Sequence, residues 1–155
     1  MTPAAVNPQV LMVMSQLFVD LPHARALGLQ YVGTDGQESV LKIAWREDLV
    51  GNPTTGALHG GVITSLIDTT SATAVTAKLP DFEMIATLDL RIDYLAAATP
   101  GEPVYCRAEC YRLTHHIAFT RAICFHVHPS DPIAQGVATF MRGSTPVPDW
   151  LKALG

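Results

Sequence analysis

Residues 60–78 read GGVITSLIDTTSATAVTAK, and the spacing of side chains in this stretch decides the fold. Its apolar and small residues recur every three or four positions, which is typical of one face of an α-helix. The positions on that face are Val62, Ile63, Leu66, Ile67, Thr70 and Ala74. On both sides of the stretch the spacing changes to two, so one long helix is predicted between groups of β-strands.

Two strands are predicted before this helix, at 27–34 and 40–46, with the hairpin signal Asp35-Gly36 between them. Residues 47–58 are rich in Gly, Pro and Thr and are predicted to form a loop. Four strands are predicted after the helix, at 88–94, 104–113, 117–127 and 133–142. Their connections are short, which favours antiparallel neighbours in a single sheet.

This pattern predicts an α+β protein with the hotdog fold, in which a curved antiparallel sheet wraps around one long central helix. The last predicted strand carries Ala134, Gly136 and Ala138. Small residues of this kind suit a sheet that passes close to a helix.

The length of 155 residues corresponds to one domain, 1–155. Asn7-Pro8 resembles an N-cap followed by proline at the first helical position, which predicts a further helix at about 8–20. The tail at 144–155 contains two prolines and is predicted to be irregular.

The composition narrows the class of function. Apolar residues make up 48% and charged residues 15%, which excludes intrinsic disorder and suggests that another subunit covers part of the surface. The net charge of −4 comes without a basic cluster, so nucleic acid is not an expected partner. The apolar stretch at 10–21 is too short to span a membrane. With no targeting segment apparent, no membrane partner and a cytoplasmic location are expected.

No metal or cofactor site is expected. Cys106, Cys110 and Cys124 form no metal-ligand spacing and are predicted to be buried on strands. His115-His116 have no carboxylate or thiol nearby and are interpreted as turn residues. His126 and His128 share one face of a predicted strand and are interpreted as solvated strand-end residues.

The opposite face of the central helix carries a single charge. Its positions are Thr64, Ser65, Asp68, Ser71, Ala72 and Val75. Because a helix face in water usually carries several charges, this face is predicted to be covered by another chain. Partial desolvation would raise the pKa of Asp68 and make it a better base at neutral pH. The alternative is that Asp68 lies on an ordinary solvated face.

The helix is preceded by Leu58-His59-Gly60-Gly61. Two glycines at a helix N-terminus leave backbone N–H groups unshielded, and the helix dipole adds partial positive charge there. Such a site can hold the oxyanion that forms when a carbonyl is attacked. The alternative is a tight turn that simply requires glycine.

Taken together, four segments resemble the PaaI-type (phenylacetic-acid-degradation-type) acyl-CoA thioesterases of the hotdog superfamily. They are GNP at 51–53, GALHGGVI at 56–63, LIDT at 66–69 and TLDLRIDYL at 87–95. The resemblance covers about residues 45–142 and implies hydrolysis of a small or medium acyl- or aryl-CoA to the free acid and CoA.

The resemblance also implies roles for individual residues. Asp68 matches the family's base or nucleophile, and Gly60 matches the backbone N–H that holds the thioester carbonyl. Asn52 and Thr87 match the residues that orient the attacking water or the substrate, with one extra residue between Asn52 and the His-Gly-Gly motif compared with some relatives. His59 and Gly61 complete the expected substrate-binding set.

The spacing of two of these residues predicts a dimer. Gly60 and Asp68 are eight positions apart, which corresponds to about 12 Å along a helix axis. One scissile carbonyl cannot contact both, whereas two antiparallel helices around a two-fold axis would bring Gly60 of one subunit to Asp68 of the other. A homodimer with active sites at the interface, or a homotetramer built from such dimers, is therefore expected.

Several alternatives stay open. Asp68 could activate water or form an anhydride, and His59 could brace the loop, which is the favoured role, or bind the substrate carbonyl. Arg91, Arg121 and Arg142 are candidate partners for the CoA phosphates. A non-catalytic acyl-CoA sensor or carrier is the main alternative function, and a hotdog dehydratase is a weaker one because the motifs of that class are not matched.

Overall fold

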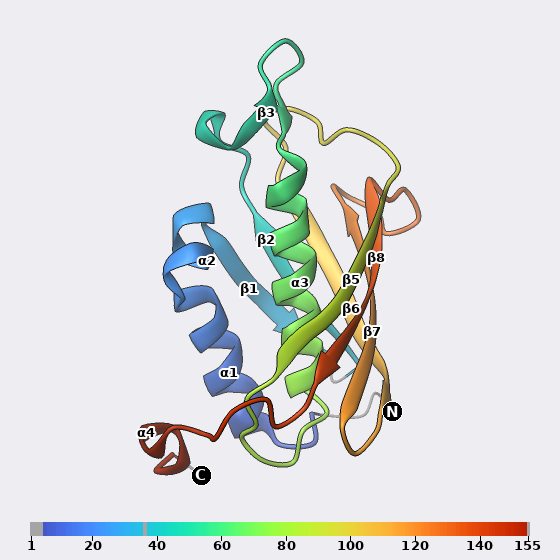
Figure 1. Cartoon of the computed structure of the whole chain (residues 1–155). Coiled ribbons are helices and arrows are strands. Elements are labelled where there is room, and N and C mark those ends of the chain that lie inside the picture. The colour runs from blue at the N-terminus through green and yellow to red at the C-terminus, as the bar shows by residue number, and fades with distance from the viewer. Residues whose placement is uncertain (1–4, 36, 155) are drawn as a thin grey trace.

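The computed structural model describes residues 5–35 and 37–154, so Gly36 of the expected hairpin turn lies outside the described residues. Six strands form one antiparallel sheet in the order β1-β2-β6-β7-β8-β5. Their bounds are Leu29–Thr34 (β1), Glu38–Ile43 (β2), Val104–Leu113 (β6), Ile117–Phe125 (β7), Ala134–Met141 (β8) and Ala86–Tyr94 (β5). The sheet curves around helix α3, Gly60–Thr76, and the predicted α+β hotdog architecture is confirmed (Figure 1).

The predicted apolar stripe of α3 faces the sheet. Val62, Ile63, Leu66 and Ile67 are buried against apolar side chains of β2, β6 and β7. On β8, a Cβ added at Gly136 would lie 3.0 Å from Cγ2 of Ile67. Close packing against the helix therefore favours glycine at this position of the last strand.

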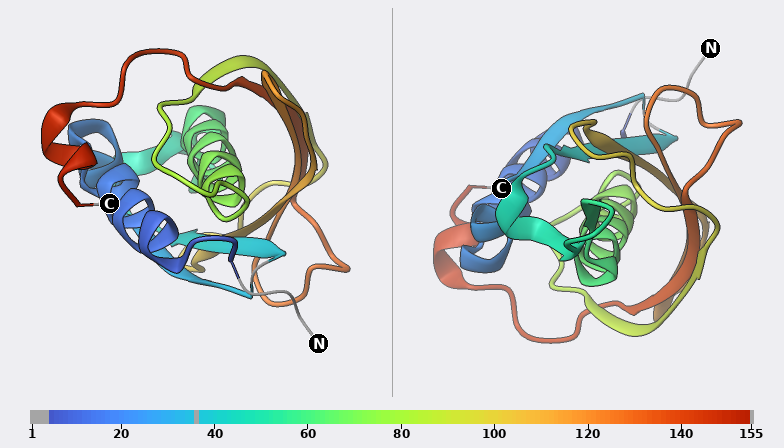
Figure 2. Two further views of the ribbon diagram at one scale, coloured as in Figure 1. Left: turned by 90° about the horizontal axis from the view of Figure 1, so that it is seen from below. Right: turned by 90° about the horizontal axis from the view of Figure 1, so that it is seen from above.

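The remaining side of α3 is partly covered by the chain's own N-terminal helices. Helix α1, Pro8–Asp20, begins at Asn7, whose side chain accepts from the N–H groups of Gln9 and Val10. Seen along the axis of α3, the sheet curves around one side and α1 lies on the other (Figure 2).

This packing corrects one sequence-based expectation. Ser71 and Val75 of α3 are buried within the chain, and Val75 belongs to the same apolar cluster as Val10 and Met14 of α1. A second copy is therefore not needed to cover the C-terminal half of that face. Periodicity indicates that a face is covered but not which segment covers it.

Local elements also differ from the prediction. A short helix, α2, occupies Pro22–Leu27, so the first strand begins two residues later than expected. The predicted loop holds a 3-10 turn at Glu47–Leu49 and a small hairpin of β3, Val50–Asn52, with β4, Ala57–Leu58. β5 begins two residues earlier than predicted, and α3 ends two residues earlier.

The tail was predicted to be irregular, and this is wrong at one point. It contains the short helix α4, Asp149–Lys152, which follows Pro148. Leu151 of this helix is fully buried in the cluster around α1 and Phe140. Burial of Leu151 anchors the tail on the core, although its two prolines favour irregular structure.

No helix among the described residues is long and apolar enough to cross a membrane. Within the same residues, no group of three or more His, Cys, Asp or Glu side chains is arranged to hold a metal ion.

Candidate active site

Asp68 lies near the middle of α3 and points toward the first residues of β5. The hydroxyl of Thr87 donates a hydrogen bond to Oδ1 of Asp68 at 2.8 Å. The register of β5 against β8 shifts between Thr87 and Asp89, which marks a β-bulge next to this contact. A bulge redirects the side chains beside it, and here it occurs where Thr87 meets the helix.

A cavity of about 240 Å³ opens beside this pair. Its other walls are mainly apolar and come from α1, α2, α3, the start of β5 and β8: Phe18, Leu21, Ala24, Ala72, Ile85 and Phe140. Desolvation in this setting raises the pKa of Asp68, and the Thr87 hydrogen bond partly opposes the rise by stabilising the carboxylate. A carboxylate with a raised pKa, next to an apolar cavity, has the properties of a general base.

The second part of the site is the N-terminus of α3. His59 is the N-cap residue, and its Nδ1 accepts from the N–H of Gly61 at 2.9 Å. The backbone N–H of His59 donates to the carbonyl oxygen of Leu49, which ties the helix start to the preceding turn. The N–H of Gly61 thus has a partner within the chain, whereas that of Gly60 has no acceptor among the described residues. Gly60 therefore presents the unpaired donor at this helix end.

Asn52 lies in the small hairpin before α3. Its Oδ1 accepts from the N–H of Thr54 at 3.0 Å, and its carbonyl oxygen accepts from the N–H groups of Thr55 and Gly56. The side chain thus stabilises its own turn. This hairpin projects beyond the N-terminal end of α3, away from the end of the helix that leads into β5 (Figure 1).

Within one chain the predicted residues form two groups. Asp68 and Thr87 contact each other, and His59 contacts Gly61. The two groups lie at different levels of α3, separated by about two helical turns.

His23 of α2 is a polar residue that the sequence reasoning did not single out. Its Nε2 lies 2.9 Å from Oγ of Ser65 on α3. His23 lines the Asp68 cavity and also a cavity of about 410 Å³ that is lined by His59 and Gly61. No local motif marks this residue, because its position depends on α2 packing across α3.

Comparison with known proteins places this geometry in a family. A sequence model of the thioesterase superfamily matches residues 55–129. The medium/long-chain acyl-CoA thioesterase YigI of Escherichia coli K12 is 30% identical over 149 residues, covering 87% of this chain and 95% of YigI. The chain belongs to the thioesterase superfamily. The motif resemblance is thereby confirmed, and this thioesterase is a thioester hydrolase.

Solved structures share this fold. A crystal structure of a Pseudomonas aeruginosa protein is 42% identical, with a TM-score of 0.77, and the match covers 85% of this thioesterase and 98% of that chain. The Escherichia coli PaaI protein from the phenylacetic acid degradation operon is 17% identical, with a TM-score of 0.74 and coverage of 86% and 93%. The second likeness shows the shared fold alone.

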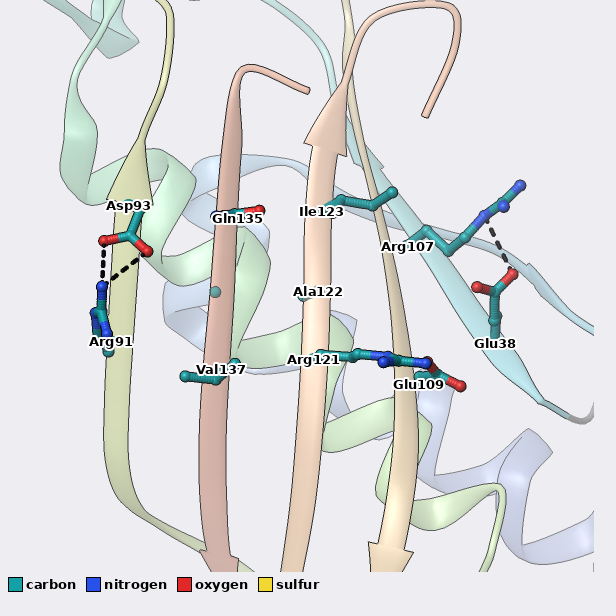
Figure 3. A pocket seen from close by; sticks show the side chains of 11 residues that line it. Glu38, Arg91, Asp93, Arg107, Glu109, Arg121, Ala122, Ile123, Gln135 and Val137 are labelled. Carbon is teal, nitrogen blue, oxygen red and sulfur yellow. Dashed lines mark hydrogen bonds and ion pairs between the residues drawn. The ribbon is translucent and has the colours of Figure 1, made fainter. Parts of the chain in front are cut away.

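A separate hollow of about 330 Å³ lies on the outer face of the sheet of this thioesterase (Figure 3). Two of the candidate cations for CoA, Arg91 and Arg121, line it, and their guanidinium groups pair with Asp93 and Glu109. The third candidate, Arg142, lies outside this hollow and pairs with Glu83. Each of the three arginines thus has a carboxylate partner within the chain.

His59→Asn is expected to leave kcat within a few-fold of the wild-type value, because asparagine is also a strong N-cap residue. His59→Ala removes the acceptor for the Gly61 N–H and should lower the free energy of unfolding by about 1 kcal/mol. Thermal melts and steady-state thioester hydrolysis on both variants test this. A large loss of kcat in a His59→Asn protein with a normal melting temperature would instead make His59 a catalytic residue.

Proposed function

We propose that this thioesterase hydrolyses medium-chain acyl-CoA thioesters to the free acid and CoA in an active site shared by two chains. The observation that carries the proposal is the pairing of Asp68 with Thr87 beside an apolar cavity. Phe18 and Leu21 offer an aliphatic chain an apolar surface. The similarity to YigI, named for medium- and long-chain acyl-CoA, supports a medium-chain substrate.

In the proposed reaction the Gly60 N–H binds the thioester carbonyl oxygen, and Asp68 acts on the carbonyl carbon. If Asp68 is a base, it takes a proton from water while the water oxygen bonds to that carbon. The tetrahedral intermediate then collapses, the C–S bond breaks, and CoA thiolate leaves and takes up a proton. If Asp68 is the nucleophile, its oxygen forms an anhydride as the thiolate leaves, and water then hydrolyses the anhydride. In either case Thr87 holds the carboxylate in position.

A single turnover in heavy-oxygen water detects an anhydride that is hydrolysed at the carboxyl carbon of Asp68. That route leaves labelled oxygen in the Asp68 side chain, whereas water activation, like hydrolysis of the anhydride at its acyl carbon, labels only the product acid. Mass spectrometry of the peptide that contains Asp68 shows whether the label is there, and a labelled side chain establishes attack by Asp68.

The proposed site requires a second chain because the Gly60 donor and Asp68 lie about 12 Å apart along one helix. β5 is an edge strand, and its outer edge has no partner among the described residues. The outer edge of this nine-residue strand offers backbone donors and acceptors to a second copy. Thr87 and Tyr94 lie on this strand, so pairing there would place both parts of the site at the interface. Asn52 is proposed to orient substrate or water in the same shared site.

Thiol release from acetyl-, octanoyl-, palmitoyl- and phenylacetyl-CoA tests the proposed substrate. We expect octanoyl-CoA to give the highest kcat/KM of the four. Release from phenylacetyl-CoA alone would contradict the aliphatic assignment. Binding of all four without release of thiol would overturn hydrolysis and support a non-catalytic acyl-CoA sensor or carrier.

The raised pKa of Asp68 predicts the pH dependence of kcat/KM. The base must be ionised, so the acidic limb of the profile should lie above the ordinary range for aspartate. Thr87→Val removes the hydrogen bond that stabilises the carboxylate, and the limb should therefore move to higher pH. Thr87→Ser keeps the hydroxyl and serves as the control. If the acidic limb of Thr87→Val lay at the same pH as in the wild type, the limb would not report the ionisation of Asp68.

A further inference from the structure

The peptide group between Gly60 and Gly61 is held at both ends by side chains. Its carbonyl oxygen accepts from the hydroxyl of Tyr94 at 2.9 Å and from that of Thr64 at 3.1 Å. Its N–H donates to Nδ1 of His59 at 2.9 Å. The two hydroxyl oxygens also lie 2.8 Å apart. Three side chains from the N-cap, the helix and β5 thus fix one peptide plane.

The preceding peptide is fixed as well. The carbonyl oxygen of His59 accepts from the N–H of Val62 at 2.9 Å. The N–H of the same peptide belongs to Gly60 and has no acceptor among the described residues. Gly60 therefore lies between two peptide groups that are fixed by hydrogen bonds. The direction of its N–H depends on both of them.

The side chain of Tyr94 lies against Gly60 and restricts its backbone. A Cβ added at Gly60 would lie 3.3 Å from the hydroxyl oxygen of Tyr94 and 3.4 Å from its Cζ. The ring thus occupies the space that a side chain at Gly60 would need. Glycine brings wide backbone freedom, and the hydroxyl of the same ring restricts that freedom by binding the Gly60 carbonyl. Both residues line a cavity of about 340 Å³ at this end of α3.

We propose that Tyr94 is a positioning residue that sets the direction of the Gly60 N–H for thioester hydrolysis. The inference rests on the proposed function, in which that N–H binds the carbonyl oxygen. A donor to a developing oxyanion is most effective when it is aligned before the reaction begins. Misalignment weakens binding of the transition state more than binding of the substrate, because full charge on the oxygen develops only during attack.

The test is Tyr94→Phe, which removes the hydroxyl and keeps the ring. With octanoyl-CoA as substrate, we expect kcat to fall about tenfold, less than the ~10²- to 10³-fold loss that follows removal of an oxyanion donor itself. KM should stay within about twofold, because uniform substrate binding is not lost. The melting temperature and the elution volume in size-exclusion chromatography should match those of the wild type.

Tyr111→Phe is the matched control. Tyr94 and Tyr111 are both 54% exposed, and the Tyr111 hydroxyl has no hydrogen-bond partner among the described residues. Removal of the Tyr111 hydroxyl should leave kcat unchanged. A tenfold fall in Tyr94→Phe alone supports positioning, whereas wild-type kcat in Tyr94→Phe, or an equal fall in both variants, overturns it. A lowered melting temperature with normal kcat would show a structural role only and also overturns it.

If Tyr94→Phe changes the elution volume, the test passes to Thr64→Val. Thr64 lies on α3, and this variant removes the other hydroxyl that donates to the Gly60 carbonyl. A fall in kcat at constant KM then supports control of the Gly60 donor through its carbonyl, and normal kcat overturns it. Failure of the wild type to hydrolyse any of the four acyl-CoAs would contradict the proposed function instead. The two failures are therefore distinguishable.

Discussion

Asp68→Asn is expected to lower kcat at least ~10²-fold on octanoyl-CoA, with the fold and oligomeric state unchanged. Asparagine has nearly the same shape and can still accept the Thr87 hydrogen bond, but it can neither remove a proton from water nor form an anhydride. The measurement is steady-state thiol release by the variant, together with its circular dichroism spectrum and elution volume. A variant with kcat within tenfold of the wild type would eliminate Asp68 as the catalytic group.

The same variant carries a stability prediction with a defined sign. Burial raises the folded-state pKa of Asp68 above its unfolded value, so ionisation favours the unfolded chain. Stability should therefore fall as the pH rises from the unfolded pKa through the folded one, and the penalty is fully present above both. Asp68→Asn removes that penalty, and at neutral pH its melting temperature should equal or exceed that of the wild type. Asp81→Asn changes an exposed carboxylate in the connection after α3 and provides the control.

Gly60→Pro is expected to abolish hydrolysis because it removes the one N–H proposed to bind the carbonyl oxygen. Proline is well tolerated at the first position of a helix, and the extended backbone of His59, with φ −61° and ψ 136°, suits a residue that precedes proline. Gly60→Ala is the matched control, because it adds a similar Cβ next to Tyr94 but keeps the N–H. The difference in kcat between the two variants measures the contribution of the donor, for which ~10²- to 10³-fold is expected.

Mixing Gly60→Pro with Asp68→Asn tests whether the site is shared. Neither variant alone should be active, but each hybrid dimer would contain one site with an intact Gly60 and an intact Asp68. Equal amounts that pair at random would give hybrids in half of the dimers, with one of two sites intact, so activity should return to about a quarter of the wild-type level. Hybrid dimers that are confirmed by mass spectrometry and remain inactive would contradict a shared site.

Much of the site is encoded locally and could be predicted. The apolar stripe of α3, the alternation in the strands and the His-Gly-Gly start of the helix depend on residues a few positions apart, so their spacing is visible in the sequence. The single charge on the polar face of α3 singled out Asp68 for the same reason. Its contact with Thr87, 19 positions later, was not predicted, because no short-range rule connects the two residues. The family resemblance implied only that Thr87 orients the attacking water or the substrate.

What the tertiary structure alone decided is which distant segments meet. α1 packs on Val75, whereas another subunit was expected to cover this residue. Leu151 turns an apparently irregular tail into an anchored helix, and the Tyr94 hydroxyl reaches the carbonyl of Gly60 across 34 positions. Helical and strand periods follow from the local geometry of the backbone and can be recognised in a short window of sequence. Contacts between segments depend on how the whole chain fills its interior, and a side chain's partner across that interior is fixed only when all the elements have packed.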